Sequence, residues 1–311
     1  MPPRLSVIIP NYNCLPYLPK ALDSVRRQQV GDYEIIVVDD GSTDNSPEWL
    51  AAEAARDPHL VVITMPGLKN GPSLARNAGI AVAKAPIVAF LDADDFWYPD
   101  AISDRLALHE SDPSAVLSFG DFRSVSPEGR DLGTYFAFRR HFHRWVDGRQ
   151  GVLPLGQRAM AMIFAEAICG TSTVLAARDS LRAIGGFRAN LIYSQDWECW
   201  LRLAGQGQVW CVPRIVTGYL VRPNSQSRDL RKVLAANRQI FDLHKPAVRA
   251  IDPRAVRLGR AELAVVAAAA NRAEGRHLRA LGWQLKATLL DPSPRACRAA
   301  AANARGLFRR R

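Results

Sequence analysis

The sequence predicts an α/β fold with a doubly wound, mostly parallel sheet, followed by a C-terminal α-helical extension. Short apolar runs alternate with amphipathic helical patterns over residues 5–119, which is typical of βαβ units. Polar turns follow three of these runs, at Asn11, Asp39 and Asp92. After residue 227 the chain changes to helical patterns rich in Ala and Arg. We therefore expect a large α/β domain over residues 1–227 and a basic helical region over 228–311.

The elements follow from periodicity and from turn residues in chain order. In the first part we predict strands at 5–9, 33–38, 60–65, 86–91 and 115–119, with helices at 16–29, from Pro47, at 71–83 and at 101–109. In the second part we predict an irregular, aromatic-rich stretch at 120–156, strands at 170–175 and 209–217, and helices at 179–184, near 196–204, and at 228–245, 253–274, 277–290 and 294–308.

Three carboxylates arrive within four residues after the apolar run 86–91: Asp92, Asp94 and Asp95. Like charges at the end of a buried strand repel and are partly desolvated. A hard divalent cation would relieve that cost, because Mg²⁺ binds few protein carboxylates and completes its shell with water and phosphate oxygens. The alternative is an acidic turn that caps the next helix. Since the Asn11, Asp39 and Asp92 turns should meet at one sheet edge, we favour a metal–diphosphate site.

Two other nucleotide-binding motifs are absent from the sequence. No G-x-G-x-x-G follows the first strand, and no G-x-x-x-x-G-K-[ST] occurs. We therefore expect the diphosphate charge to be met by the metal and by Arg76, early in the 71–83 helix. Asp196, near a helix start, is either an N-cap or a carboxylate base.

The positive charge of the chain is concentrated in its last part. Residues 228–311 hold 19 Lys and Arg against 6 Asp and Glu, whereas residues 1–227 hold 22 against 24. This asymmetry predicts an anionic partner, and we expect an acidic membrane surface rather than nucleic acid. Helices that simply pack on the catalytic domain or on a second subunit are the alternative. No apolar run suits a membrane span or a signal peptide, and the five scattered Cys suggest reduced thiols. We expect a cytoplasmic protein, peripheral on the inner face of the membrane.

Four motifs in residues 1–227 carry a resemblance to a known family. They are Val7–Asn13, Val38–Asp44, Asn70–Gly79 and Phe90–Asp95, the last containing a D-x-D. Together they resemble the inverting family 2 glycosyltransferases, which have a GT-A fold. The resemblance implies a metal-dependent hexosyltransferase-type enzyme that uses a nucleotide-diphosphate sugar, Mg²⁺ or Mn²⁺, and a saccharide or lipid-linked acceptor. Such an enzyme would serve cell-surface polysaccharide or glycolipid synthesis.

The resemblance also implies a role for each matching residue. Residues 1–119 would form the nucleotide-sugar half and residues 120–227 the acceptor half. Asp94 would bind the metal, and Asp196 in Gln195-Asp196-Trp197 would be the catalytic base, although the family usually has Glu where Gln195 stands. Gly186 and Trp197 would lie on the acceptor side. The remaining positions would bind the nucleotide sugar: Pro10, Tyr12, Asp39, Arg76, Asp92, Ala93 and Arg222, the last standing where the family often has His.

Three other functions are alternatives. A sugar-phosphate nucleotidyltransferase would carry a Gly-rich N-terminal loop with a basic residue, and this sequence has no such loop. A processive synthase would add transmembrane helices and a Q-x-x-R-W motif. A non-catalytic nucleotide-sugar-binding module would not need Asp196, since binding alone needs no base. The sequence does not identify the nucleotide, the sugar, the linkage, the acceptor or the oligomeric state.

Overall fold

The computed structural model describes residues 2–67, 70–222, 225 and 228–292. The chain divides into two compact units. The α/β unit comprises Met1–Ala159 and Ile168–Arg222, and the helical unit comprises Met160–Ala167 and Pro223–Arg311. Residues 160–167 thus group with the helices that follow residue 222, although they lie inside the expected 1–227 domain.

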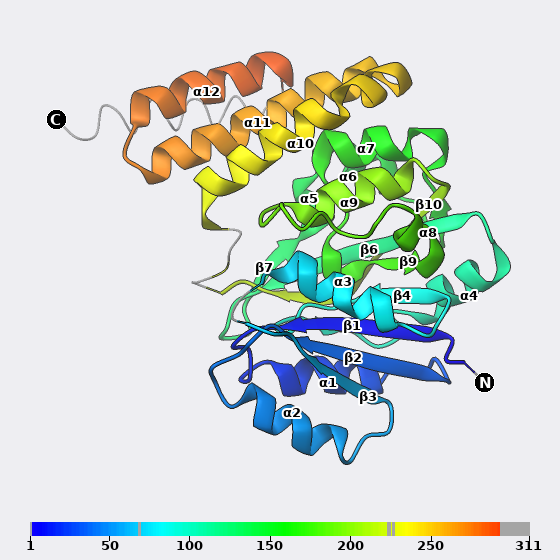
Figure 1. The fold of residues 1–311 in the computed structure, drawn as a ribbon. Coiled ribbons are helices and arrows are strands. Elements are labelled where there is room, and N and C mark those ends of the chain that lie inside the picture. Colours follow the sequence, from blue (N-terminus) through cyan, green and yellow to red (C-terminus); the bar gives the residue numbers. More distant parts are fainter. Residues whose placement is uncertain (1, 68–69, 223–224, 226–227, 293–311) are drawn as a thin grey trace. The chain divides into compact units, whose positions relative to one another are not determined.

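The α/β unit is built on one sheet with the strand order β3-β2-β1-β4-β9-β6-β10-β5 (Figure 1). The first four strands in this order are parallel, β9 runs antiparallel between β4 and β6, and β6 and β10 are parallel to each other. The strands are β1 (Leu5–Asn11), β2 (Tyr33–Asp39), β3 (Leu60–Thr64), β4 (Ile87–Phe90), β5 (Phe96–Trp97), β6 (Ala115–Val125), β7 (Asp131–Thr134), β8 (Leu153–Pro154), β9 (Leu175–Ala177) and β10 (Gln208–Leu220).

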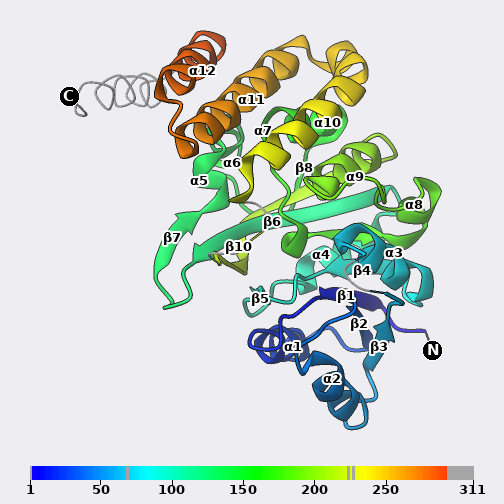
Figure 2. The same ribbon diagram turned by 60° about the vertical axis from the view of Figure 1, so that its left-hand side comes forward.

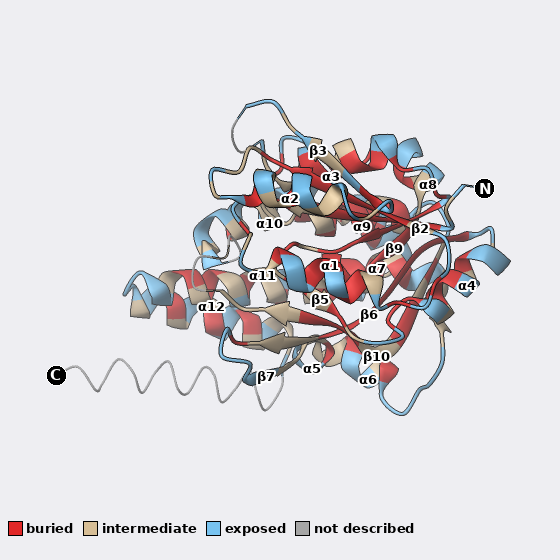
Figure 3. Ribbon diagram, turned by 90° about the horizontal axis from the view of Figure 1, so that it is seen from below, coloured by how far each residue is buried: buried red, intermediate tan, exposed pale blue. Residues whose placement is uncertain are grey.

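Helices cover both faces of this sheet. The face with Leu5, Val7 and Ile9 packs on α1 (Leu18–Arg26) and α2 (Ser46–Ala54) in one apolar cluster. On the other face α3 (Pro72–Val82) lies so close to β1 that a Cβ built on Gly79 would come within 2.6 Å of Ile8 Cγ2. Figure 3 shows buried residues along the strands, with exposed residues on the outer sides of the helices. The helices on both faces of the mostly parallel sheet therefore confirm the predicted doubly wound architecture.

Aromatic side chains complete the second face, where β4 meets two segments from later in the chain. The Phe90 ring lies 5.4 Å from that of Phe187 and 5.7 Å from that of Trp200. Trp200 belongs to α9 (Gln195–Ala204) and is fully buried. The remaining helices of the unit are α4 (Ser103–Ser111), α5 (Tyr135–Phe138), α6 (Arg140–Val146) and α8 (Arg178–Ala183). This packing places the start of α9 next to the carboxyl end of β4.

Two sequence-based predictions for this unit are wrong. The stretch 120–156 is not irregular, because it holds the second half of β6, then β7, α5, α6 and β8 (Figure 2). Its aromatic residues Phe136 and Phe142 pack on each other and on the Phe119 ring just before the stretch. The stretch 170–175 is not one strand: Thr171–Thr173 forms a 3-10 turn, and β9 begins only at Leu175.

The helical unit contains α10 (Leu230–Ile251), α11 (Pro253–Ala273) and α12 (His277–Leu290), together with most of α7 (Ala159–Glu166). The ring centroids of Phe164 in α7 and Phe241 in α10 lie 4.9 Å apart, and Gly259 of α11 lets both rings approach its backbone. The helix predicted at 294–308 lies outside the described residues. None of the described helices is long and apolar enough to cross a membrane.

Candidate active site

Asp39 organises the turn after β2. Its Oδ1 accepts hydrogen bonds from Asn11 Nδ2 at 2.7 Å and from Ser42 Oγ at 2.6 Å, and its Oδ2 accepts one from the Ser42 amide at 3.0 Å. Asp39 is buried, whereas Pro10 and Tyr12 beside it are partly exposed. The two turns after β1 and β2 therefore meet at one edge, as predicted from the parallel strands.

Asp40 anchors the start of the next motif, and sequence reasoning assigned it no role. Its two carboxylate oxygens accept hydrogen bonds from the backbone amides of Asn70, at 2.8 Å, and Gly71, at 2.7 Å. Gly71 has φ +98°, a conformation that disfavours other residues. Because α3 begins at Pro72, Asp40 fixes where this helix starts. The Asp-Asp-Gly sequence was the available signal, but the partner lies 30 residues away.

Arg76 of α3 reaches the end of β4. Its Nη2 lies 2.6 Å from Asp92 Oδ1, and its side chain is only 4% exposed. The Arg76 Nε and Nη1 atoms are buried and have no hydrogen-bond partner among the residues that the structure describes. Buried donors without partners cost free energy, so this guanidinium is suited to an additional acceptor.

A second ion pair joins Asp94 to Arg222, which follows β10. Arg222 Nη2 lies 2.6 Å from Asp94 Oδ2, and the two side chains are 27% and 17% exposed. The Arg222 guanidinium also lies 5.2 Å from the centre of the Tyr17 ring. Burial, reinforced by the nearby Asp92 carboxylate, raises the pKa of Asp94, and Arg222 opposes that rise. Ala93 between the two aspartates is buried.

Asp95 ties the turn to two distant segments, the 3-10 turn Thr171–Thr173 and the end of β10. Ser172 Oγ donates to Asp95 Oδ2 at 2.5 Å, and the Leu220 amide donates to Asp95 Oδ1 at 3.0 Å. Burial, followed by repulsion from Asp94 and Asp92, raises the pKa of Asp95 well above its usual range. Since Leu220 is two residues before Arg222, Asp95 helps to hold Arg222 over Asp94.

Asp196 lies in the first turn of α9, and Ser194, with φ +54°, occupies the N-cap position. The predicted alternative of Asp196 as the N-cap is therefore wrong. Thr171 Oγ1 donates to Asp196 Oδ2 at 2.8 Å, and the Trp197 amide donates to Asp196 Oδ1 at 2.8 Å. Asp196 is partly exposed, whereas Trp197 is buried.

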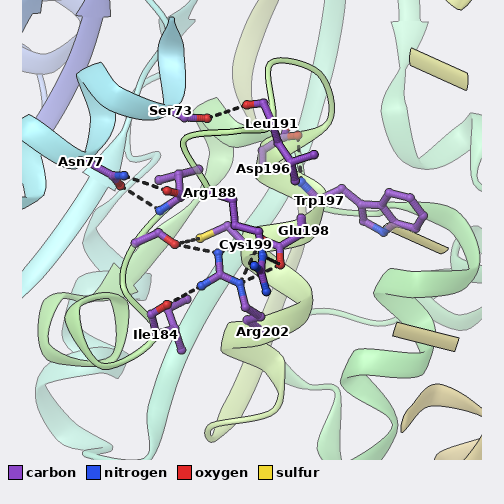
Figure 4. A network of polar contacts seen from close by, with 12 residues as sticks. Ser73, Asn77, Ile184, Arg188, Leu191, Asp196, Trp197, Glu198, Cys199 and Arg202 are labelled. Carbon is purple, nitrogen blue, oxygen red and sulfur yellow. Dashed lines mark hydrogen bonds and ion pairs between the residues drawn. The ribbon is translucent and has the colours of Figure 1, made fainter. Parts of the chain in front are cut away.

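The neighbouring Glu198 has a structural environment (Figure 4). Its side chain is 0% exposed and lies 2.6 Å from Arg188 Nε and 2.7 Å from Arg202 Nη2. Arg202 also donates to the Ile184 and Gly186 carbonyls, at 2.6 Å and 2.7 Å. Gly186 has φ +66° and leaves no room for a Cβ. This network fixes the loop before α9 and leaves Asp196 as the accessible carboxylate of the helix start.

A family model described as glycosyl transferase family 2 matches residues 6–168, which is more than half of the chain. The chain belongs to glycosyl transferase family 2. The match begins in β1 and includes the Asp39, Arg76 and Asp92–Asp95 segments described above, so the resemblance of the sequence motifs to this family is confirmed.

Named relatives are similar to the chain over part of their length. Chondroitin synthase of Pasteurella multocida is 33% identical over 127 residues, which is 41% of this chain and 13% of that protein. EpsJ, an uncharacterised glycosyltransferase of Bacillus subtilis, is 41% identical over 96 residues, 31% of this chain and 27% of that protein. An uncharacterised Mycobacterium tuberculosis protein is 28% identical over 247 residues, 77% of this chain and 73% of that protein. The chain thus matches a small part of the synthase's length.

Two solved structures share the fold of this chain. The mannosyltransferase PcManGT from Pyrobaculum calidifontis, in complex with GDP-Man and Mn2+, has a TM-score of 0.64 at 20% identity, over 99% of this chain and 81% of that chain. S. aureus TarS 1-349 in complex with UDP has a TM-score of 0.63 at 17% identity, over 93% and 81%. At these identities the likeness concerns the fold, and it confirms the predicted GT-A-like sheet followed by helices.

The turn after β4 offers oxygen ligands of the kind that hard divalent cations prefer, the partly exposed carboxylates of Asp92 and Asp94. Asp94 already faces a positive group, Arg222, and Asp92 is the more exposed carboxylate beside it. In the described part of the chain no three His, Cys, Asp or Glu side chains form a complete metal cage. Mg²⁺ and Mn²⁺ need no such cage, since hard cations at such sites keep waters and substrate phosphates. The residues present therefore fit a metal held jointly with a ligand.

Proposed function

We propose that this chain is an inverting glycosyltransferase that moves a sugar from a nucleotide-diphosphate sugar to an acceptor hydroxyl. The observation that carries the proposal is the pair of arginine–aspartate contacts after β4, Arg76–Asp92 and Arg222–Asp94. Each carboxylate lies beside its own arginine, and Arg76 has two buried donors without a partner among the described residues. Such a site suits a ligand that carries both hydroxyls and phosphates.

The donor side is assigned residue by residue. Arg76 and Asp92 would bind the nucleotide and its ribose, with Pro10, Tyr12, Asp39 and Ala93 nearby. Asp94 would bind Mg²⁺ or Mn²⁺, which supplies positive charge to the departing diphosphate when bound. Arg222 would contact the diphosphate, because it is the cation nearest to Asp94.

The acceptor side would be formed around Asp196. Asp196 takes the proton of the acceptor hydroxyl while that oxygen bonds to the anomeric carbon. The bond between the anomeric carbon and the diphosphate oxygen breaks, and the nucleoside diphosphate leaves with the electron pair. Displacement by one nucleophile in one step inverts the anomeric centre. The proposed donor sugar is a hexose, and the proposed acceptor is a saccharide or a lipid-linked molecule. Gly186 and Trp197 would lie on the acceptor side.

The experiment that tests this function replaces Asp196 with Asn. We expect kcat to fall by about 10²–10⁴-fold, the usual value of a positioned base, with the KM for the donor nearly unchanged. The measurement is turnover of UDP-, GDP- and dTDP-sugars with Mn²⁺ on a panel of acceptors. The matched control is Asp179→Asn, because Asp179 is an exposed aspartate in another helix start, paired with Arg178. Wild-type turnover in Asp196→Asn would show that the base lies elsewhere.

Two alternative functions make different predictions in the same experiment. A nucleotide-sugar-binding module would bind the donor and release no nucleotide in either variant. A sugar-phosphate nucleotidyltransferase would release pyrophosphate from a nucleoside triphosphate and a sugar phosphate. Detection of the free nucleoside diphosphate together with glycosylated acceptor separates glycosyl transfer from both.

We also propose that the helical unit attaches the enzyme to an anionic membrane surface on the cytoplasmic side. The carrying observation is the outward face of α12, where Leu278 and Leu289 are 76% and 83% exposed and Leu285 is also exposed. These leucines lie opposite Ala280, Gln284 and Ala287, which form the buried face. Arg279 and Lys286 flank the leucines, and α12 contains no Asp or Glu. An apolar stripe with basic flanks suits an interface between anionic headgroups and acyl chains.

A further inference from the structure

The 3-10 turn Thr171–Thr173 contacts two carboxylates, Asp196 in α9 and Asp95 in the turn after β4. Its Thr171 hydroxyl donates to Asp196 Oδ2 at 2.8 Å. The adjacent Ser172 hydroxyl donates a hydrogen bond to Asp95 Oδ2 at 2.5 Å and accepts one from the Asp92 amide at 3.1 Å. Two consecutive side chains therefore connect the α9 carboxylate to the D-x-D turn after β4.

The backbone of this turn is held firmly from the other side. The Ser172 carbonyl accepts hydrogen bonds from Trp97 Nε1 at 2.7 Å and from Thr217 Oγ1 at 2.9 Å. The Thr173 carbonyl accepts one from Arg105, a fully buried residue whose Nε donates to the Ala101 carbonyl at 3.1 Å. Residues of β5, β10 and the start of α4 thus fix the turn, so the Thr171 hydroxyl has little freedom to move.

The consequence for Asp196 is a fixed carboxylate plane. One oxygen accepts the Thr171 hydroxyl and the other accepts the Trp197 amide. The amide belongs to α9 itself, so Thr171 provides a hydrogen bond to this carboxylate from outside the helix. The Thr171 hydroxyl therefore acts on the orientation of the group.

We infer that Thr171 is a positioning residue for the base, and that the Thr171–Thr173 turn sets the placement of Asp196 relative to the donor-side aspartates. This inference rests on the proposed function of Asp196. It assigns a role in the transfer step to a residue that lies outside all four sequence motifs and that acts through Asp196.

The test compares Thr171→Val, which removes the hydroxyl and keeps the shape, with Thr171→Ser, which keeps the hydroxyl. A hydrogen bond to a charged group contributes enough that its loss should lower kcat by about 10- to 100-fold. We expect Thr171→Val to show this loss with the KM for the donor within about twofold of wild type. Thr171→Ser, which keeps the hydroxyl, should restore kcat to near the wild-type value.

A matched control comes from the same turn. The Thr173 hydroxyl donates to the Gly170 carbonyl at 2.7 Å and contacts no carboxylate, so Thr173→Val disturbs the turn without touching the base. Its kcat should stay near the wild-type value. If Thr171→Val keeps the wild-type kcat, or if Thr173→Val lowers kcat equally, the inference is overturned. Thr171→Ala gives the same readout if Thr171→Val fails to fold.

The failure of this inference is distinguishable from failure of the proposed function. If Asp196→Asn keeps wild-type turnover, the base assignment is wrong and the role of Thr171 is wrong with it. If Asp196→Asn loses turnover while Thr171→Val behaves like wild type, the base assignment stands and the positioning role alone is overturned.

Discussion

Neighbouring aspartates after β4 differ because each meets a different partner. Asp92 faces Arg76, Asp94 faces Arg222, and Asp95 is bound by Ser172 and the Leu220 amide. Repulsion between the three is thus offset by one cation each for the first two and by hydrogen bonding for the third. The first two carboxylates remain partly exposed, which is what a ligand-binding role requires.

The Asp94–Arg222 pair predicts how donor binding depends on pH. Burial and Asp92 raise the pKa of Asp94, and Arg222 holds that rise in check. Asp94 binds a metal only when it is ionised, so metal-dependent donor binding weakens as the pH falls. In Arg222→Met the pKa of Asp94 rises further, and binding should be lost at a higher pH than in wild type. Calorimetry of UDP- and GDP-sugars with Mn²⁺ from about pH 5 to pH 8 measures this.

Two variants serve as controls for that experiment. Asp94→Asn cannot ionise, so its metal-dependent binding should be weak at every pH. Arg214→Met removes another arginine–aspartate contact, with Asp104 at 2.8 Å, and should leave the pH dependence as in wild type. An Arg222→Met profile that overlays wild type would contradict the proposed electrostatic role of Arg222.

Single residues differ in how far sequence alone identifies them. Asp94 and Asp196 belong to local patterns, a D-x-D after an apolar run and an aspartate before Trp197. Asp40, Asp95 and Thr171 have roles set by partners 30, 77 and 25 residues away. Since such partners depend on the whole fold, no local pattern could reveal them.

Secondary-structure elements were predictable wherever one periodicity dominates. The buried strands β1, β2 and β4 and the helix α3 lie close to their predicted bounds. The prediction for 120–156 was wrong because most elements of that segment are short, so no single periodicity dominates it. The prediction for 170–175 was wrong because Thr171–Thr173 forms a 3-10 turn, in which the Thr171 and Ser172 hydroxyls bond to carboxylates.

The packing of α3 on β1 gives a stability prediction for a matched pair of glycines. In Gly79→Ala the new methyl would lie 2.6 Å from Ile8 Cγ2, and we expect a loss of about 1–3 kcal/mol from overpacking. Gly282 of α12 has no atom within 4 Å of the Cβ position, so Gly282→Ala should stabilise its helix by about 0.5–1 kcal/mol. Urea unfolding followed by circular dichroism measures both. Equal effects of the two substitutions would contradict the close α3–β1 contact.

At the scale of the whole chain, the two compact units differ in composition. All residues proposed for donor binding and catalysis belong to the α/β unit. In the helical unit, residues 228–292 hold 13 Lys and Arg against 6 Asp and Glu. The sequence predicted this charge asymmetry directly. It did not predict that residues 160–167 join the helical unit, because that contact depends on rings such as Phe164 and Phe241 that meet only after folding.

The membrane proposal predicts that the 311-residue chain co-sediments with anionic vesicles and not with neutral ones. Each basic residue near an anionic surface contributes about 1 kcal/mol, and salt screens that attraction, so binding should fall as salt rises. Leu278→Gln with Leu289→Gln should weaken vesicle binding by at least about tenfold, because each leucine contributes about 2 kcal/mol when buried.

The control for that measurement is a double substitution of exposed apolar residues in the α/β unit. Val82 and Leu132 are both 46% exposed, so Val82→Gln with Leu132→Gln changes the surface polarity without touching α12. This control should bind vesicles as wild type does.

Two results would overturn the membrane proposal. One is wild-type protein that ignores anionic vesicles at low salt. The other is an α12 double variant that binds normally. If the α12 variant instead changes the oligomeric state in light scattering without any vesicle binding by wild type, the leucine face of α12 contacts a second copy of the chain.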